Sequence, residues 1–480
     1  MAEAKPKQDS SAELIARLES LVGAKGLVTE PGDMAPHLHD RRERYRARAR
    51  CVVKPANTEE VAEVVRLCAA QGVPMVPQGG NTGLVAGGIP DEDGRAVVIN
   101  LARMNRIRGL DPINDTITVE AGCILQNVQA AAEDADRLFP LSLGAEGSCQ
   151  IGGNLSTNAG GIQVLRYGNA RELVLGLEVV LPDGRVWDGL RALRKDNTGY
   201  DLKQIFIGAE GTLGVITAAV LKLFPRPKET ATAFVAVPDV AAAVALLGRV
   251  RAATGEAVTS FELIPRLALD FALAHVAGIQ DPLSERHDWY LLIELSTGAG
   301  SGSLGAALEG VLAQALDAGL VRDAALAASG AQAQAFWRIR EGIVEAQKFE
   351  GGSIKHDVSV PISAIAEFVA RASNAAEALV PGVRPLAFGH LGDGNIHFNL
   401  AQPEGADTEE FLARWNALRR AVYQVVVDLN GSISAEHGIG RLNLAANLRS
   451  KSEVEIDLMR KIKRALDPEN LMNPGRVVPE

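Results

Sequence analysis

The chain has 480 residues, of which 47% are hydrophobic and 22% charged, with a formal net charge of −10 at pH 7. This length predicts two or three domains, and the acidic balance argues against a nucleic-acid partner. The N-terminus lacks the apolar core of a secretory signal, and no apolar run reaches the roughly 18 residues that span a bilayer. We therefore expect a cytoplasmic protein without a transmembrane segment.

The first part of the chain alternates apolar strands with amphipathic helices. A helix is expected from Ser10 to Val22, within an N-terminal helical segment of residues 1–45. From Cys51 onward, turn residues separate short apolar runs. The expected helices cover 58–71 and 125–134, and the expected strands cover 52–53, 73–77, 96–101, 116–120, 172–181, 185–187 and 215–224. Pro225 and Pro227 mark the end of a domain that we place at 46–227.

The second part repeats a strand–helix–strand pattern. Its expected strands lie at 233–237, 257–263, 289–296, 324–327 and 353–360, and its helices at 240–253, 304–316 and 337–349. This split β-α-β pattern predicts an antiparallel sheet in a domain of residues 228–430. Residues 431–480 return to a glycine-rich polar sequence and form a separate C-terminal segment. The four cysteines form no C-x-x-C pair, which predicts buried small side chains rather than disulfides.

Glycine-rich stretches dominate the first domain. One is PQGGNTG at Pro77, a second runs from Gly144 to Gly161, and a third surrounds Glu210. The Gly144–Gly161 stretch has no hydrophobic period, so we expect neither a helix nor a strand there. Glycines let a ligand approach the main chain, and successive backbone N–H groups bind anions. These stretches predict a site for a large polar cofactor that carries phosphate groups; a flexible linker is the alternative.

Histidines and one glutamate suggest a second site. His390 and His397 flank a Gly-Asp-Gly-Asn turn, and a reversal there would bring the two imidazoles together. With Glu436 they form a ligand set suited to a divalent metal, with zinc as the first candidate. Adjacent residues of an extended chain point in opposite directions, so His437 is expected to face the substrate and act as a general base. For each histidine, a purely structural role is the alternative.

The charge expected around these three residues restricts the class of substrate. A divalent cation with two neutral imidazoles and one carboxylate keeps roughly one positive charge. Arg340 and Lys355 could add more, which favours a small dicarboxylate or hydroxy acid. The alternative for Arg340 is a surface pair with Glu341 or Glu345.

The motifs together resemble a known family. These are PQGGNTG, GGNLSTNAGG at Gly152, FIGAEGTLGVIT at Phe206, HLGDGNIHFN at His390 and SAEHGIG at Ser434. The chain resembles FAD-linked oxidoreductases with the vanillyl-alcohol-oxidase (PCMH) type of FAD domain, particularly the D-2-hydroxyglutarate and D-lactate dehydrogenase flavoproteins. The resemblance implies an α+β fold. It comprises a two-subdomain FAD-binding domain, a ferredoxin-like antiparallel-sheet cap domain for the substrate and a C-terminal segment that returns to the FAD domain.

The resemblance also implies roles for individual residues. His390, His397 and Glu436 match the metal positions and His437 the base, while Arg340, Lys355 and Asn399 match positions that hold substrate carboxylates. The residues expected along FAD are Pro77, Gln78, Gly79, Gly80, Asn81, Thr82, Gly83, Pro140, Gly144, Gly152, Gly153, Ser156, Thr157, Ala159, Gly160, Gly161, Glu210, Gly211, Gly214, Ile216 and Asn473.

Two departures from the family pattern matter. No histidine lies between His39 and His275, where some relatives attach FAD covalently, and Cys149 lies closer to Gly152 than the attaching cysteine of bicovalent relatives. We therefore expect non-covalent FAD. Val344 stands where the hydroxyglutarate enzymes carry a hydroxyl side chain, which leaves D-malate and D-lactate as alternatives to D-2-hydroxyglutarate.

The expected activity is oxidation of a D-2-hydroxy acid to the 2-oxo acid, with hydride transfer to flavin. The electron acceptor could be a quinone, an electron-transfer flavoprotein or a cytochrome, and a homodimer is expected from the resemblance alone. Rival readings are a metal-dependent hydrolase, a non-redox flavin-dependent synthase of the same superfamily and a non-catalytic flavin or metal sensor.

Overall fold

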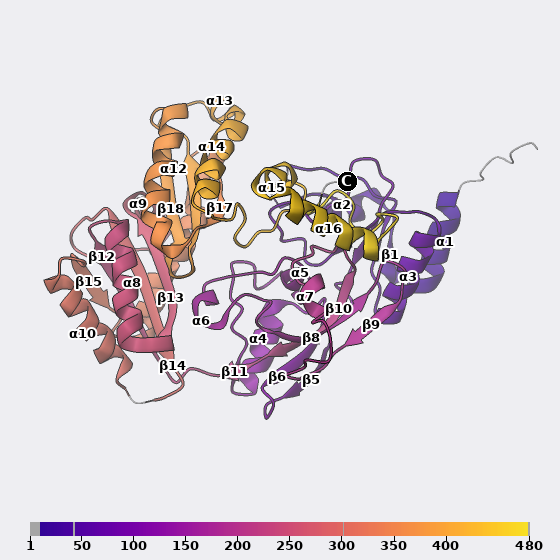
Figure 1. The fold of residues 1–480 in the computed structure, drawn as a ribbon, viewed down its shortest axis with the longest axis horizontal. Helices are drawn as coiled ribbons and strands as arrows, with labels where there is room; N and C mark the ends of the chain where they lie inside the picture. Colours follow the sequence, from indigo (N-terminus) through magenta and orange to yellow (C-terminus); the bar gives the residue numbers. More distant parts are fainter. Residues whose placement is uncertain (1–9, 42–43, 301, 479–480) are drawn as a thin grey trace, which may run out of the picture. The chain divides into compact units, whose positions relative to one another are not determined.

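The computed structural model describes residues 10–41, 44–300 and 302–478, which form two compact units (Figure 1). Unit 1 contains the described residues up to Ala159, then Asn169–Pro225, and the C-terminal residues from Glu436 onward. Unit 2 contains Gly160–Gly168 and Arg226–Ala435. Each unit combines helices with one or more sheets, so the prediction of an α+β fold is confirmed.

The first sheet of unit 1 has the strand order β1-β2-β4-β3 and is parallel apart from β1. Helix α3 (Thr58–Ala70) packs against α1 (Ser10–Val22), and both contribute to the buried cluster beside this sheet. The side chain of Asn57 accepts the N–H of Glu60, which caps α3. The strands are β1 (Leu27–Val28), β2 (Cys51–Val53), β3 (Met75–Gln78) and β4 (Val97–Asn100).

The second sheet of unit 1 is antiparallel, with the order β5-β6-β10-β8-β9. The predicted hairpin around Pro182-Asp183-Gly184 is present as β8 and β9, and Gly184 adopts a φ of 80° that suits glycine. The strands are β5 (Ile107–Asp111), β6 (Thr116–Glu120), β8 (Val174–Val180), β9 (Val186–Gly189) and β10 (Val215–Lys222). Smaller elements of the unit are η1 (Ala24–Gly26), α2 (Pro31–Leu38), α4 (Leu125–Asp134), β7 (Arg137–Leu138), α7 (Lys203–Phe206) and β11 (Phe224–Pro225).

The central glycine-rich stretch contains a helix that the sequence analysis did not expect. Helix α5 (Ile151–Ser156) buries Ile151 and Leu155, which are four residues apart and therefore share one face. A Cβ at Gly152 would lie 2.8 Å from the Cβ of Ala121. Two apolar side chains and a close backbone approach are thus enough to stabilise one short helix. The prediction of an irregular segment was wrong for these six residues.

The C-terminal segment also contains helices that were not predicted. They are α15 (Leu444–Ser450) and α16 (Glu453–Leu466), the latter opened by a capping box of Ser452 and Glu455. Lys463 Nζ donates to the carbonyl of Thr212 and to Asp467 within unit 1. Met472 forms a parallel bridge with Met75, the first residue of β3. The C-terminal residues are therefore an integral part of unit 1.

Unit 2 is built on an eight-stranded sheet in which every pair of neighbours is antiparallel. The main path is β15-β12-β14-β13-β18-β19-β16, and β17 also pairs with β19. Helices α8 (Val240–Thr254) and α10 (Leu304–Asp317) pack against each other and contact strands of this sheet (Figure 1). The strands are β12 (Glu229–Val237), β13 (Val258–Pro265), β14 (Trp289–Thr297), β15 (Asp323–Leu326), β16 (Ser353–Ile354), β17 (Asp357–Ser359), β18 (Arg384–His390) and β19 (Asn395–Ala401).

The predicted strand at 353–360 is divided into β16 and β17. His356, between them, is 2% exposed and its Nδ1 donates to the carbonyl of Phe398. The helices of unit 2 are α6 (Val164–Tyr167), α8 (Val240–Thr254), α9 (Arg266–His275), α10 (Leu304–Asp317), α11 (Gly330–Ala346), α12 (Ile365–Leu379), α13 (Thr408–Ala413) and α14 (Trp415–Asp428), with the single turns η2 (Gly255–Ala257), η3 (Gln347–Phe349), η4 (Ile362–Ala364) and η5 (Leu391–Asp393). Across the described residues, every helix is too short or too polar to cross a bilayer.

Candidate functional site

A pocket in unit 1 brings the three glycine-rich stretches together. It encloses about 980 Å³ of unfilled space, part of it open to solvent. Fifteen of its lining residues were expected to contact FAD: Pro77, Gln78, Gly79, Gly80, Asn81, Thr82, Gly83, Gly152, Gly153, Ser156, Thr157, Glu210, Gly211, Gly214 and Ile216. A Cβ at Gly80 would lie 2.0 Å from the carbonyl oxygen of Ser148, so only glycine permits this approach of two loops.

The chemistry of the pocket lining fits a flavin nucleotide. The side-chain oxygens of Gln150 and Asn154 are buried and have no hydrogen-bond partner in the described part of the chain, and both residues line the pocket. Buried acceptors without partners are costly, so they favour a ligand that brings donors. A flavin ring carries such donor groups and an apolar body that matches Val85, Leu101 and Val215 of the lining.

Six residues expected along FAD do not line this pocket. Pro140 is buried elsewhere, Gly144 is exposed, Ala159 is buried, and Gly160 and Gly161 belong to unit 2. Asn473 is 1% exposed, and its Nδ2 donates to the carbonyls of Gly87 and Glu210, so it joins loops of the pocket. The lining residues that were not named as FAD contacts are Val85, Ala86, Gly87, Gly88, Leu101, Ala121, Cys149, Gln150, Asn154 and Val215, of which Cys149, Gln150 and Asn154 lie within the Gly144–Gly161 stretch.

Glu210 attaches the returning C-terminal segment to the pocket. Its two carboxylate oxygens accept the backbone N–H groups of Ile439 and Gly440, each at 2.7 Å. These residues follow His437, which itself lines the pocket. Burial raises the pKa of Glu210 to about 7, against the opposing effect of the two N–H groups and of Arg476. The carboxyl group thus fixes the position of the segment that carries His437.

The raised pKa of Glu210 predicts a pH-dependent stability. The folded state binds this proton more tightly than the unfolded state, whose pKa is near 4.5, so the stabilisation is complete below about pH 4.5 and is lost as the pH rises through about 7. Relative to Glu210→Gln, the wild type should lose about 3 kcal/mol of unfolding free energy across this window. Denaturant unfolding of both proteins at several pH values measures this loss. A difference between the two proteins that stays constant with pH would contradict it.

His390 and His397 come together at a hairpin in unit 2. They lie on β18 and β19, and η5 with Gly394 makes the reversal between these strands. Gly394 has a φ of 91°, and a Cβ there would lie 2.4 Å from the carbonyl oxygen of Val360. The two imidazole centroids are 5.3 Å apart. The convergence expected from the Gly-Asp-Gly-Asn turn is therefore present.

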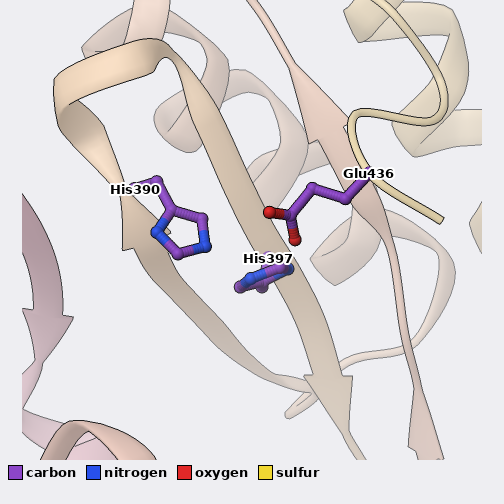
Figure 2. A group of neighbouring side chains, drawn as sticks. All are labelled: His390, His397 and Glu436. Atoms are coloured by element: carbon purple, nitrogen blue, oxygen red, sulfur yellow. The ribbon is translucent and has the colours of Figure 1, made fainter. Parts of the chain in front are cut away.

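Glu436 completes the group. Figure 2 shows its carboxylate directed toward the imidazoles of His390 and His397, and the three potential ligand atoms lie within 4.8 Å of one another. The backbone N–H of Ala435, the last residue of unit 2, donates to the carbonyl of Asp357. Glu436 is the next residue, so its backbone position is restrained by the hydrogen bond between Ala435 and Asp357.

The reasoning that separated Glu436 from His437 does not hold. These residues lie in a bend rather than in an extended strand, and Gly438 follows with a φ of 81°. Their potential ligand atoms lie within 4.8 Å of each other. Adjacent side chains can converge here because the backbone turns. The assignment of Glu436 to a metal and of His437 to catalysis therefore remains a prediction.

Each of the two imidazoles has a carboxylate near its Nδ1 atom. His390 Nδ1 lies 2.7 Å from Glu262 Oε1, and His397 Nδ1 lies 3.6 Å from Asp357 Oδ1. Burial alone would raise the pKa of Glu262, but His390 and Arg340 overcome it and lower the pKa to about 2. Metal-binding imidazoles are commonly oriented by such carboxylates. The donor set and its surroundings therefore fit a divalent metal.

Two of the three predicted substrate residues are buried in unit 2. Arg340, on α11, is 6% exposed and pairs with Glu262, not with Glu341 or Glu345 as the alternative proposed. Asn399, on β19, donates from Nδ2 to Gln347 Oε1. Lys355 is half-buried between β16 and β17. Glu262 was not predicted as a site residue, although a lone acid inside the apolar strand run Phe261–Ile264 was a usable signal.

Comparison with known proteins identifies the family. Residues 49–189 match the family model described as "FAD binding domain". Residues 226–477 match the family model described as "FAD linked oxidases, C-terminal domain". The D-2-hydroxyglutarate dehydrogenase of Arabidopsis thaliana is 37% identical over 470 residues, which cover 97% of this chain and 81% of that protein. A D-2-hydroxyglutarate dehydrogenase of Xanthomonas citri pv. viticola is 38% identical over 463 residues and covers 96% of both chains.

The prediction of a cytoplasmic location is contradicted by these comparisons. The relatives from Arabidopsis thaliana, Bos taurus and Rattus norvegicus carry the word "mitochondrial" in their names. The prediction rested on the lack of a signal-like N-terminus, which is weak evidence about location.

Solved structures agree with this assignment at the level of the fold. A p-cresol methylhydroxylase superposes with a TM-score of 0.76 at 18% identity, over 98% of this chain and 97% of that one. The two matched domains cover most of the chain. More than a third of the residues are identical to those of each of the two dehydrogenases named above, over nearly the whole chain. The chain therefore belongs to the FAD-linked oxidase family, in its group of FAD-dependent D-2-hydroxyacid dehydrogenases.

Proposed function

We propose that this chain is a metal-dependent enzyme that oxidises a dicarboxylic D-2-hydroxy acid to the 2-oxo acid, with D-2-hydroxyglutarate as the first candidate substrate. The observation that carries this proposal is the group of His390, His397 and Glu436, whose ligand atoms lie within 4.8 Å. Its neighbour in sequence, His437, lines the flavin pocket. Of these two consecutive residues, Glu436 thus belongs to the donor set and His437 to the pocket lining.

Different groups of residues have different roles in the proposed reaction. His390, His397 and Glu436 would hold a divalent ion, and such an ion would polarise the substrate's hydroxyl and neighbouring carboxylate oxygens. His437 takes the hydroxyl proton as general base, since this residue lines the flavin pocket. Arg340 and Lys355 bind the distal carboxylate, and the residues of the unit 1 pocket orient FAD, which supplies the hydride acceptor.

The identity of the substrate rests on the distal carboxylate. The named relatives act on D-2-hydroxyglutarate, which supports a dicarboxylate. Val344, one turn after Arg340 on α11, is 48% exposed and offers no hydroxyl. D-malate and D-lactate therefore belong in the substrate panel, measured by anaerobic bleaching of the flavin absorbance. Bleaching by none of the three would contradict the proposal and favour a non-redox flavin enzyme.

Arg340→Met tests the distal carboxylate site. Because charge-assisted hydrogen bonds contribute about 1.5–3 kcal/mol, the KM for D-2-hydroxyglutarate should rise about 10–100-fold. The KM for D-lactate, which lacks a distal carboxylate, should change little. Arg338→Met is the matched control, because Arg338 lies on the same helix, is exposed and donates to the carbonyl of Ala277. Equal effects of Arg340→Met on both substrates would contradict the assignment.

Non-covalent FAD is part of the proposal. Cys149 lines the flavin pocket, but burial raises the pKa of its thiol, which disfavours the reactive thiolate. Acid precipitation should therefore release the flavin into the supernatant. Flavin that stays with the precipitated protein would contradict this part of the proposal.

A further inference from the structure

Glu262 connects the metal-type donor set to the arginine proposed for the substrate. It lies on β13, where its Cα pairs with that of His390 on β18, and it is 1% exposed. Its Oε1 lies 2.7 Å from His390 Nδ1, and its Oε2 lies 2.7 Å from Arg340 Nε. One carboxylate thus accepts from both residues, with a separate oxygen for each.

For His390, this contact selects the tautomer. Donation from Nδ1–H to Glu262 places the lone pair of the neutral ring on Nε2, the atom that such an imidazole uses to bind a metal. The carboxylate also fixes the rotation of the ring. His397 has a looser equivalent, because its Nδ1 lies 3.6 Å from Asp357.

For Arg340, the contact leaves the ends of the guanidinium available. Nε is engaged by Glu262, and the guanidinium carbon lies 5.1 Å from the centre of the Phe388 ring. Glu262 and Phe388 therefore hold the group from two directions. Among the described residues, neither Nη atom of Arg340 has a hydrogen-bond partner, although the residue is 6% exposed. A nearly buried guanidinium with an unpaired fork is suited to bind a carboxylate.

A purely structural ion pair is the competing explanation. Burying charges has a large desolvation cost, so a buried pair of this kind is weak evidence for stability. A purely structural ion pair would need only the contact between Glu262 and Arg340. It would not require the other oxygen of Glu262 to accept from the imidazole of His390. The division of the two oxygens between a metal-type ligand and a free guanidinium fork points to a role in the site.

We propose that Glu262 is a positioning residue that sets His390 and Arg340 in one fixed geometry, so that metal affinity and recognition of the acid's distal carboxylate depend on the same side chain. This inference rests on the function proposed above. It assigns Glu262 no contact with the substrate. Its effect is transmitted through the two residues that it holds.

The test is Glu262→Gln, measured by Zn²⁺ competition with a chromophoric chelator and by steady-state kinetics. The amide presents an NH₂ group to one of the two donors, and it lacks the charge that strengthens the bond to Arg340. Zn²⁺ affinity should fall about 10–100-fold, and the KM for D-2-hydroxyglutarate should rise about tenfold. FAD content should match the wild type.

Glu294→Gln is the matched control. Glu294 lies on the neighbouring strand β14 and accepts from Trp337 Nε1, which is on the same helix as Arg340. This control removes a carboxylate that links the sheet to α11 without touching the site. It should leave both readouts unchanged. Unchanged Zn²⁺ affinity or unchanged KM in Glu262→Gln overturns the shared role.

A double variant covers the case in which Glu262→Gln fails to fold. Glu262→Gln with Arg340→Met removes both buried charges, and it should bind Zn²⁺ about 10–100-fold more weakly than Arg340→Met alone. Equal affinity of these two proteins overturns the inference. A wild type that binds no Zn²⁺ overturns the metal part of the proposed function and this inference with it. A wild type that binds Zn²⁺ as tightly as Glu262→Gln overturns the inference only.

Discussion

Replacing His437 by alanine is expected to lower kcat by about 10²–10⁴-fold while FAD stays bound, because general base catalysis contributes on this order. His437 lines the flavin pocket, and Glu210 accepts the backbone N–H groups of Ile439 and Gly440, two and three residues later. The loop is therefore anchored by its backbone. Removing the imidazole should leave its path intact, and a rapid-mixing assay of flavin reduction measures the chemical step directly.

His275→Ala is the control for this experiment. His275 ends α9, pairs with Glu350 and stacks on Phe349 in unit 2, with no contact to the proposed donor set. Its removal should leave flavin reduction unchanged. Near-normal flavin reduction in His437→Ala would show that another group takes the substrate proton.

Removal of the metal should have an effect of similar size. A bound divalent ion contributes several kcal/mol to the polarisation of an oxygen, so dialysis against a chelator should lower kcat/KM by about 10²–10⁴-fold. The flavin absorbance should persist, because the residues that line its pocket exclude His390, His397 and Glu436. Added Zn²⁺ should restore the activity of the wild type.

Glu436→Gln separates this effect from chelation of an accidental metal. The amide keeps the shape of the side chain but loses the charge that offsets a cation. Metal content per protein should fall, and Zn²⁺ should not restore activity at concentrations that restore the wild type. Full activity in metal-free protein would exclude a role for the donor set in catalysis.

The sequence predicted which of the proposed site residues lie close together better than it predicted their surroundings. His390 and His397 were expected to meet because a glycine-rich turn separates them, and local chain reversal is a short-range property. The glycine-rich stretches were expected to line a cofactor pocket because their composition exposes backbone. Both inferences depend on a few neighbouring residues, which a linear sequence displays directly.

Long-range partners could not be read from the sequence. Glu262 lies 128 positions before His390, and their contact depends on the pairing of β13 with β18. Glu210 accepts from a backbone N–H 230 positions later. The α5 helix was missed for a different reason: its two buried apolar side chains, Ile151 and Leu155, lie in a helix of only 6 residues, which is too short for a period to emerge.

The central claim is that a flavin pocket and a metal-type donor set serve the oxidation of a D-2-hydroxy acid. Anaerobic addition of D-2-hydroxyglutarate, D-malate or D-lactate to purified holoprotein, followed by its visible flavin absorbance, tests this claim most directly. The account predicts that at least one of these acids bleaches the flavin in protein with Zn²⁺ and fails to do so at a comparable rate after chelation. Flavin that keeps its absorbance with all three acids, with Zn²⁺ present, would contradict it.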